Sequence, residues 1–527
     1  MSIIFELNQL CSSRSVTKFF KNTEGDSLIQ SLYRLVHSGK YTEDEIAKKI
    51  YGKDATADHA KYKALRTRLR NIFLEAFMMQ ETRNPSYTTY EQAYQHGYQQ
   101  LALLRVLAGK RAYKVARDIA VVVFKNVRNY EIIPLNQGLT DILASLHLGV
   151  AYNQKLFEYY SDLHRHYSQA AFDLNVISNY YREIRNSIYA QRESPSTTGQ
   201  RAREYAGICA KIAKNYPAVS QLQGMYISME MTGCILRGEY NEAIKVAEQG
   251  EKILMKCEGV SQTVLSILAL ERVDCAIRLN DFEMGKQQIA SARLQIAKKS
   301  MHELKLVEYA IKLGLRTRNY EFAYREFVAL DKSSIKRLLT PRHAEYWLIL
   351  EAAINLLLTA GEIIPDESWP VLRKFRTKKF INDVPSFGRE KRGVNIQILV
   401  IQALYFIIMK KYDDMVERTD ALNAYCKRYL KNDENRRNDA FFKLLLIVIK
   451  ANFNRAKAIE KGKYTFGKLR DTTDWSSLNN TEIIPYEDLW MILLSHLEEK
   501  PKRGRSKHHV QKSNRTIASV GRKPVGD

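Results

Sequence analysis

The sequence predicts an all-α protein: an α-solenoid of antiparallel helical hairpins, with an N-terminal three-helix module and a disordered basic tail. Two observations predict this architecture. A short phrase returns along the chain, in which a polar turn is followed by an aromatic residue and, three positions on, by a small or flexible residue. In addition, only 11 prolines and 24 glycines punctuate the 527 residues, which favours long helices over many short strands.

The repeated phrase is clearest at residues 237–247 and returns at 280–285, at 318–323 and, more loosely, at 411–415. A helical hairpin cannot bury its apolar face alone, so we expect successive hairpins to stack into an extended array. At the aromatic and small positions, a second helix should pack against the helix before it. These positions are Tyr240, Ala243, Ala247, Phe282, Gly285, Tyr320 and Ala323.

The second halves of these units resemble tetratricopeptide repeats, in which a small residue is followed by a large apolar one and then by another small one. Ala243, Ala247 and Gly250 stand at these positions in the first copy, and only the first of them, Ala243, is a good match. The aromatic residues recur after 42 and 38 residues, whereas the family prefers about 34. Bulky Met231 also stands where the family has a small residue. The resemblance implies a degenerate, longer-helixed repeat over about residues 98–455; an irregular all-helical domain is the alternative.

The N-terminal region, residues 1–80, is predicted to form three short helices. The first spans residues 26–37, and the second begins at a capping box made by Thr42 and Glu45. The third helix is expected at residues 58–79. This arrangement resembles a helix-turn-helix or winged-helix module.

The third helix of this module carries an outer stripe of three bases, Lys63, Arg66 and Arg70. The resemblance implies that these side chains would meet phosphates or a major groove. The connection at residues 51–57 is longer than the tight turn of that family, and no wing is evident. A cap on the end of the solenoid is the other interpretation, because terminal repeats need a polar outer face.

The rest of the chain divides by composition. A loop is expected at residues 193–199, and Pro365, Pro370 and Pro385 interrupt a longer stretch. The predicted parts are the three-helix module (1–80), helical repeats (81–360), an irregular connection (361–390), C-terminal helical hairpins (391–497) and the disordered basic tail (498–527).

The formal net charge is +24, and its densest part is the tail. From Lys500 to Lys523 there are nine Lys or Arg and no acid, among them Arg503, Arg505 and Lys507. Too few apolar residues are present for this segment to fold alone. The tail could bind phosphates by releasing counterions, or it could act only as a solubilising segment.

Motifs for chemistry are absent from the sequence: there is no phosphate-binding loop, no H-E-x-x-H and no G-x-S-x-G. We therefore expect no enzyme activity, no metal and no cofactor. The six cysteines are scattered, as in a reducing compartment. The longest apolar run, residues 394–409, is short for a membrane span and contains three polar amides. The expected location is cytoplasmic.

The expected function is a non-enzymatic scaffold whose helical-repeat groove binds a peptide or protein helix. The alternative is a DNA-binding regulator that uses the N-terminal module, with the repeats as sensor or recruiter. An unrecognised enzyme is the third class, and it would need convergent polar groups in a deep pocket. The oligomeric state is left open.

Overall fold

The computed structural model describes residues 3–11, 13–21, 27–78, 89–148, 152–190, 194–257, 259–298, 300–330, 341–367, 369, 375–376, 380, 392–419, 436–471 and 482–499. Within these ranges the protein is all-α, and the one β-type contact is an isolated bridge between Asn454 and Glu498. The predicted fold class is therefore confirmed at this level. The tail residues Arg503, Arg505 and Lys507 and most of the expected connection at 361–390 lie outside the described residues.

The helices that the structure describes fall into four consecutive sets along the chain. The N-terminal set is α1 (Ile3–Leu10), α2 (Ser13–Lys21), α3 (Ser27–Ser38), α4 (Glu43–Tyr51) and α5 (Ala60–Met78). The next set is α6 (Tyr90–Gly109), α7 (Tyr113–Val127), the 3₁₀ turn η1 (Arg128–Tyr130), α8 (Ile133–Leu146), α9 (Gln154–Ala190) and α10 (Pro195–Ala213). The middle set is α11 (Ser220–Leu236), α12 (Tyr240–Leu254), α13 (Gln262–Leu279), α14 (Phe282–Gln295), α15 (Met301–Arg316) and α16 (Tyr320–Val328). The C-terminal set is α18 (Pro341–Thr359), α20 (Arg392–Ile408), α21 (Tyr412–Glu417), α23 (Arg436–Lys450), α24 (Arg455–Asp471) and α25 (Tyr486–Ser495).

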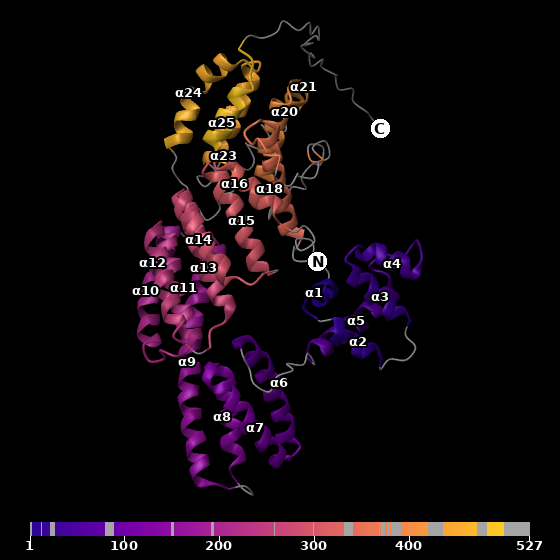
Figure 1. Cartoon of the computed structure of the whole chain (residues 1–527), viewed down its shortest axis with the longest axis vertical. Coiled ribbons are helices and arrows are strands. Elements are labelled where there is room, and N and C mark those ends of the chain that lie inside the picture. The colour runs from indigo at the N-terminus through magenta and orange to yellow at the C-terminus, as the bar shows by residue number, and fades with distance from the viewer. Residues whose placement is uncertain are drawn as a thin grey trace, which may run out of the picture.

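Helices adjacent in the chain pack against each other, most extensively α10 with α11, α8 with α9 and α11 with α12. Figure 1 shows these pairs following one another along the long axis of the molecule, from α6–α9 at one end to α23–α25 at the other. α13 also contacts α15, so the first helix of one hairpin touches the first helix of the next. The 37-residue α9 joins two parts of this array, because it packs on α8 and also on α10 and α11.

The same turn ends six of the described helices. In each, one residue has a left-handed φ between 50° and 78°, and the N–H of the next residue donates to the carbonyl five positions back at 2.8–3.3 Å. This is a Schellman ending, which satisfies carbonyls that the helix leaves free. The donor and acceptor pairs are Ala112 and Leu107, Glu239 and Cys234, Asp281 and Ala276, Glu362 and Leu357, Lys411 and Phe406, and Phe453 and Val448.

An aromatic residue directly follows four of these turns and begins the next helix: Tyr113, Tyr240, Phe282 and Tyr412. The polar turn of the repeated phrase is thus a helix-ending motif, and the aromatic residue is the first of the second helix. The copy at Tyr113 is not apparent from the phrase, because Lys110-Arg111-Ala112 lacks its acidic residue.

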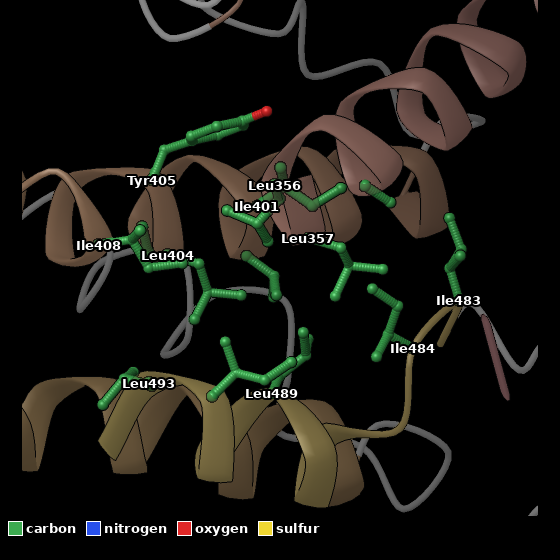
Figure 2. Close-up of a cluster of buried hydrophobic side chains, with 14 of the residues drawn as sticks. Leu356, Leu357, Ile401, Leu404, Tyr405, Ile408, Ile483, Ile484, Leu489 and Leu493 are labelled. Atoms are coloured by element: carbon green, nitrogen blue, oxygen red, sulfur yellow. The ribbon is translucent and has the colours of Figure 1, made fainter. Parts of the chain in front are cut away.

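Apolar packing is divided among several clusters along the array. The largest joins α15, α16, α18, α20, α23, α24 and α25. In Figure 2, Leu357 of α18 and Leu404 of α20 lie over Leu489 and Leu493 of α25. A separate cluster holds the N-terminal helices together around Tyr62, Leu69 and Phe73.

Two local expectations need correction. The described residues of the N-terminal module form five helices, because α1 and α2 also pack on α5, and Ile4 and Val16 are buried there. The expected loop at 193–199 is helical from Pro195 onward. Ser194 caps this helix by accepting from the Thr197 N–H at 3.1 Å, and proline is well suited to the first helical position.

Candidate functional site

The first helices of the central hairpins are enclosed on nearly all sides. No residue from His302 to Arg316 of α15 is exposed, and the same holds from Ser220 to Arg237 at α11. A helix buried all round should be apolar all round. α13 and α15 depart from this rule, because each carries a line of ionisable side chains at helical spacing.

On α13 this line consists of Glu271, Asp274 and Arg278, which spacings of three and four place on one face. Arg278 Nε donates to Asp274 Oδ2 at 2.6 Å, and both side chains are largely buried. Burial alone would raise the pKa of Asp274, but Arg278 and Lys312 outweigh it and hold that pKa below its usual value. Asp274 is therefore a fixed negative charge at the centre of the face.

On α15 the matching line consists of Lys305, Tyr309 and Lys312, with Glu308 beside it. Lys305 Nζ donates to Glu308 Oε1 at 2.5 Å and lies 4.7 Å from the centre of the Tyr309 ring. Burial, followed by the charges of Asp274 and Glu271, raises the pKa of Tyr309 well above its usual value. We call the six residues Glu271, Asp274, Arg278, Lys305, Tyr309 and Lys312 the α13–α15 charged face.

Glu271 and Lys312 differ from the other charges of this face. Both are half-buried, and neither forms a hydrogen bond or an ion pair with any residue that the structure describes. Burial, and then Asp274, raises the pKa of Glu271 to about 7. Burial lowers the pKa of Lys312 to about 8, although the negative charge of Asp274 acts against this. Two ionisable groups are thus held in a poorly solvated place without a hydrogen-bond or ion-pair partner among the described residues.

Further side chains border the face. Arg185 of α9 lies close enough to Glu271 to lower its pKa, against the larger effect of burial. Tyr346 of α18 is half-buried, and burial, followed by the charge of Glu308, raises its pKa. The α13–α15 charged face is therefore bordered by side chains of α9 and α18, and together these residues offer donors, acceptors and aromatic surface.

The predicted packing residues lie mostly inside the hairpins. Ala243, Ala247 and Ala323 are fully buried, and Tyr240 and Tyr320 are buried at the starts of α12 and α16. Phe282 is partly buried and meets Phe322 edge-to-face at 5.3 Å.

Gly285 is placed differently from the expectation. A Cβ added there would lie 2.5 Å from Leu313 Cδ2 on α15. Gly285 therefore allows α14 to approach the following hairpin, whereas we expected it to face the helix before. The sequence does not indicate which of its two neighbouring helices a glycine approaches.

The predicted nucleic-acid stripe lies on α5, as expected, but two of its bases are paired with acids. Arg66 Nη1 donates to Glu43 Oε2 at 3.0 Å, and Lys63 lies 2.9 Å from Asp58. Arg70 donates to the side chain of the adjacent Asn71. These acids lie on α4 and in the connection before α5. The spacing of bases along α5 alone therefore could not predict the two pairs.

Sequence reasoning missed the α13–α15 charged face, although one signal for it exists. Glu271, Asp274 and Arg278 recur at spacings of three and four within a mostly apolar stretch, Leu268–Leu279, which also contains Arg272. Only the neighbouring helices show that this side of α13 is poorly solvated.

Among the described residues, no group of three or more His, Cys, Asp and Glu side chains could hold a metal ion. None of the described helices combines the length and apolarity that a membrane crossing requires. Comparison of the chain with protein-family models, with curated proteins and with solved structures gave no significant match.

Proposed function

We propose that the protein is a non-enzymatic interaction scaffold and that the α13–α15 charged face binds its partner. The observation that carries this proposal is the state of Glu271 and Lys312, two half-buried charges without a hydrogen-bond or ion-pair partner among the described residues. Keeping a charge in a poorly solvated place costs free energy unless a partner compensates for it. A bound ligand with matching charges would supply that partner.

The chemistry of the face defines the ligand as a peptide segment that carries both signs of charge. Lys312 offers three N–H donors to a carboxylate, and Glu271 offers two acceptor oxygens to an ammonium or guanidinium group. Tyr309 lies on the same face, near enough to Glu271 for that charge to raise its pKa, and offers aromatic surface. A peptide with an acidic and a basic residue, bound across α13 and α15, would satisfy both charges.

The repeated turns support the array on which this face depends. Six helices end in the same Schellman turn, and α13 contacts α15 directly. An α-solenoid of tetratricopeptide-like hairpins accounts for both features, because each hairpin in such an array packs mainly on the next. The first helices then line one side, where side chains from several repeats converge on one ligand.

A cytoplasmic location is part of the proposal. The five cysteines within the described residues are all free, and four of them are buried. Burial raises the pKa of Cys275 and Cys209, which keeps their thiols protonated and unreactive. Unpaired structural cysteines of this kind suit a reducing compartment.

The experiment is a selection of peptides from a random phage-displayed library on the full-length chain. Selected peptides are then measured by fluorescence anisotropy against wild type, Lys312→Met and Glu271→Gln. We expect binding to fall at least about tenfold in each variant, since close charge pairs at interfaces couple by about 1.5 kcal/mol or more. The matched control is Lys245→Met, an exposed lysine on α12, which should bind like wild type. Equal binding by all variants would overturn the proposal.

A further inference from the structure

A second surface, distant in sequence from the α13–α15 charged face, lies on α24. This helix contains six bases and two acids; the bases are Arg455, Lys457, Lys461, Lys463, Lys468 and Arg470. All six are exposed. The buried side of the helix is made by Ala458, Gly462 and Leu469, which pack towards α23 and α25. Figure 1 places α24 at the outer edge of the C-terminal helices.

Three lysines and one tyrosine form a single line on the exposed side. Lys457, Lys461, Tyr464 and Lys468 follow at spacings of four, three and four, so they share one face of the helix. The line is about 17 Å long, since each residue advances the helix by about 1.5 Å. Tyr464 is 72% exposed, and Lys468 Nζ lies 4.6 Å from the centre of its ring. We call these four residues the α24 basic stripe.

The chain also returns to the start of α24 immediately before the basic tail. Arg455 N donates to the Glu498 carbonyl at 3.0 Å, and Asn454 Nδ2 donates to the Glu499 carbonyl at 3.0 Å. The sequence that follows, Lys500 to Lys523, has nine bases and no acid. The most basic segment of the chain therefore follows directly on residues that contact the start of α24.

We propose that the α24 basic stripe binds single-stranded nucleic acid, with the lysines on the phosphates and Tyr464 stacked on an unpaired base. Lysines attract the backbone by releasing condensed counterions, and an aromatic ring among them provides a stacking platform for any base. A duplex keeps its bases stacked and would leave Tyr464 unused. An anionic membrane would require an apolar band on the same side, whereas Tyr464 is the one large apolar side chain in this line.

The test measures anisotropy of a labelled 20-nucleotide oligo(U) with the full-length chain between 50 and 300 mM salt. The triple variant K457Q/K461Q/K468Q should bind at least about tenfold more weakly, and its salt slope should fall by about 2, since each phosphate contact on a single strand contributes about 0.7. The matched control K110Q/K114Q/K125Q removes three exposed lysines at and near α7 and should stay within about twofold of wild type.

The role of Tyr464 is tested separately, because a purely electrostatic surface would not require it. Tyr464→Phe should retain binding, whereas Tyr464→Leu should weaken it by about fivefold or more through loss of stacking. Equal weakening by the two lysine triples, or full binding by the α24 triple, would overturn the proposal. So would equal affinity for a duplex of the same length. Binding to phosphatidylserine vesicles that depends on the stripe, without oligo(U) binding, would also overturn it.

Discussion

Gly314 shows how closely the two helices of one hairpin approach. A Cβ added at this position would lie 2.8 Å from the Asn319 carbonyl oxygen and 2.9 Å from Ala323 Cβ. Backbone cannot move aside as a flexible side chain can, so Gly314→Ala should lower the free energy of unfolding by about 1 to 3 kcal/mol. Urea unfolding followed by circular dichroism measures this change.

Gly207 of α10 is the matched control, because a Cβ added there meets nothing within 4 Å. Gly207→Ala should raise the free energy of unfolding by about 0.5 to 1 kcal/mol through its greater helix propensity. The same substitution should thus act in opposite directions at the two positions. A loss of stability in Gly207→Ala, or none in Gly314→Ala, would contradict the packing described at these two positions.

Glu271 should make stability depend on pH. Its pKa is about 7 in the folded chain, against an ordinary value of 4.5. Between these values the folded state binds more protons than the unfolded state, so the free energy of unfolding falls as the pH rises from about 4.5 through about 7. Glu271→Gln removes this fall in the free energy of unfolding. At pH 8 the variant should be more stable than wild type by about 1 to 2 kcal/mol, and below pH 4.5 the difference should vanish.

The measurement for Glu271 is urea unfolding at pH values from 4 to 8.5, for wild type and Glu271→Gln. Glu460→Gln, at an exposed position on α24, serves as the control and should follow wild type throughout. Parallel curves for wild type and Glu271→Gln would mean that Glu271 is solvated in the folded chain. The first support for the candidate site would then be lost.

At the scale of elements, Arg437 joins the C-terminal helices. It donates to Glu482 at 2.8 and 2.9 Å, to Glu487 of α25 at 2.7 and 3.0 Å, and to the Leu469 carbonyl of α24 at 2.8 Å. Arg437→Met should therefore cost about 3 to 5 kcal/mol, because two acids would lose their cation in a buried place.

One further substitution separates charge from geometry at Arg437, and a second, at Lys443, is the control. Arg437→Lys keeps the charge but not the planar fork of donors, so its cost should be intermediate. Lys443→Met breaks an exposed pair with Asp439 on the same helix and should cost less than about 1 kcal/mol. Thermal unfolding gives the order of the three variants; an Arg437→Met cost as small as that of Lys443→Met would contradict a buried structural role.

The elements themselves were largely predictable where local rules decide them. The Thr42–Glu45 capping box predicted the start of α4, and both of its hydrogen bonds are present. The helix-ending turns before Tyr240 and Phe282 were also recognisable, because Gly238 and Asn280 readily adopt a left-handed φ. The turn with Arg111, whose φ is 61°, was missed, since arginine carries no such signal.

At the scale of the whole molecule, sequence alone could not identify the site. A charge on a helix is solvated or enclosed depending on the neighbouring helices, and these come from distant parts of the chain. The charge of Arg185 on α9 lowers the pKa of Glu271, and the Arg66 side chain donates a hydrogen bond to Glu43 on α4. The first interaction adds to a candidate site, whereas the second weakens a site that the sequence had suggested.

Long-range contacts also join the two ends of the α6–α13 segment. Glu91 Oε1, at the start of α6, accepts from the Gln262 N–H at 2.7 Å and from Ser261 Oγ at 3.2 Å, at the start of α13. A carboxylate at a helix N-terminus stabilises the free N–H groups there. Glu91→Ala should therefore lower the melting temperature, with a cost of about 1 kcal/mol. Differential scanning calorimetry against Glu158→Ala, on α9, would reveal it; equal melting temperatures would contradict this link.

The central claim is that the α13–α15 charged face binds a peptide through Glu271 and Lys312. The most direct test is a double-mutant cycle, by calorimetry, between Lys312→Met and an acidic-to-amide change in a selected peptide. We expect a coupling energy of about 1.5 kcal/mol or more, as for close charge pairs at interfaces. A coupling below about 0.5 kcal/mol, for every acidic residue of the peptide, would contradict it.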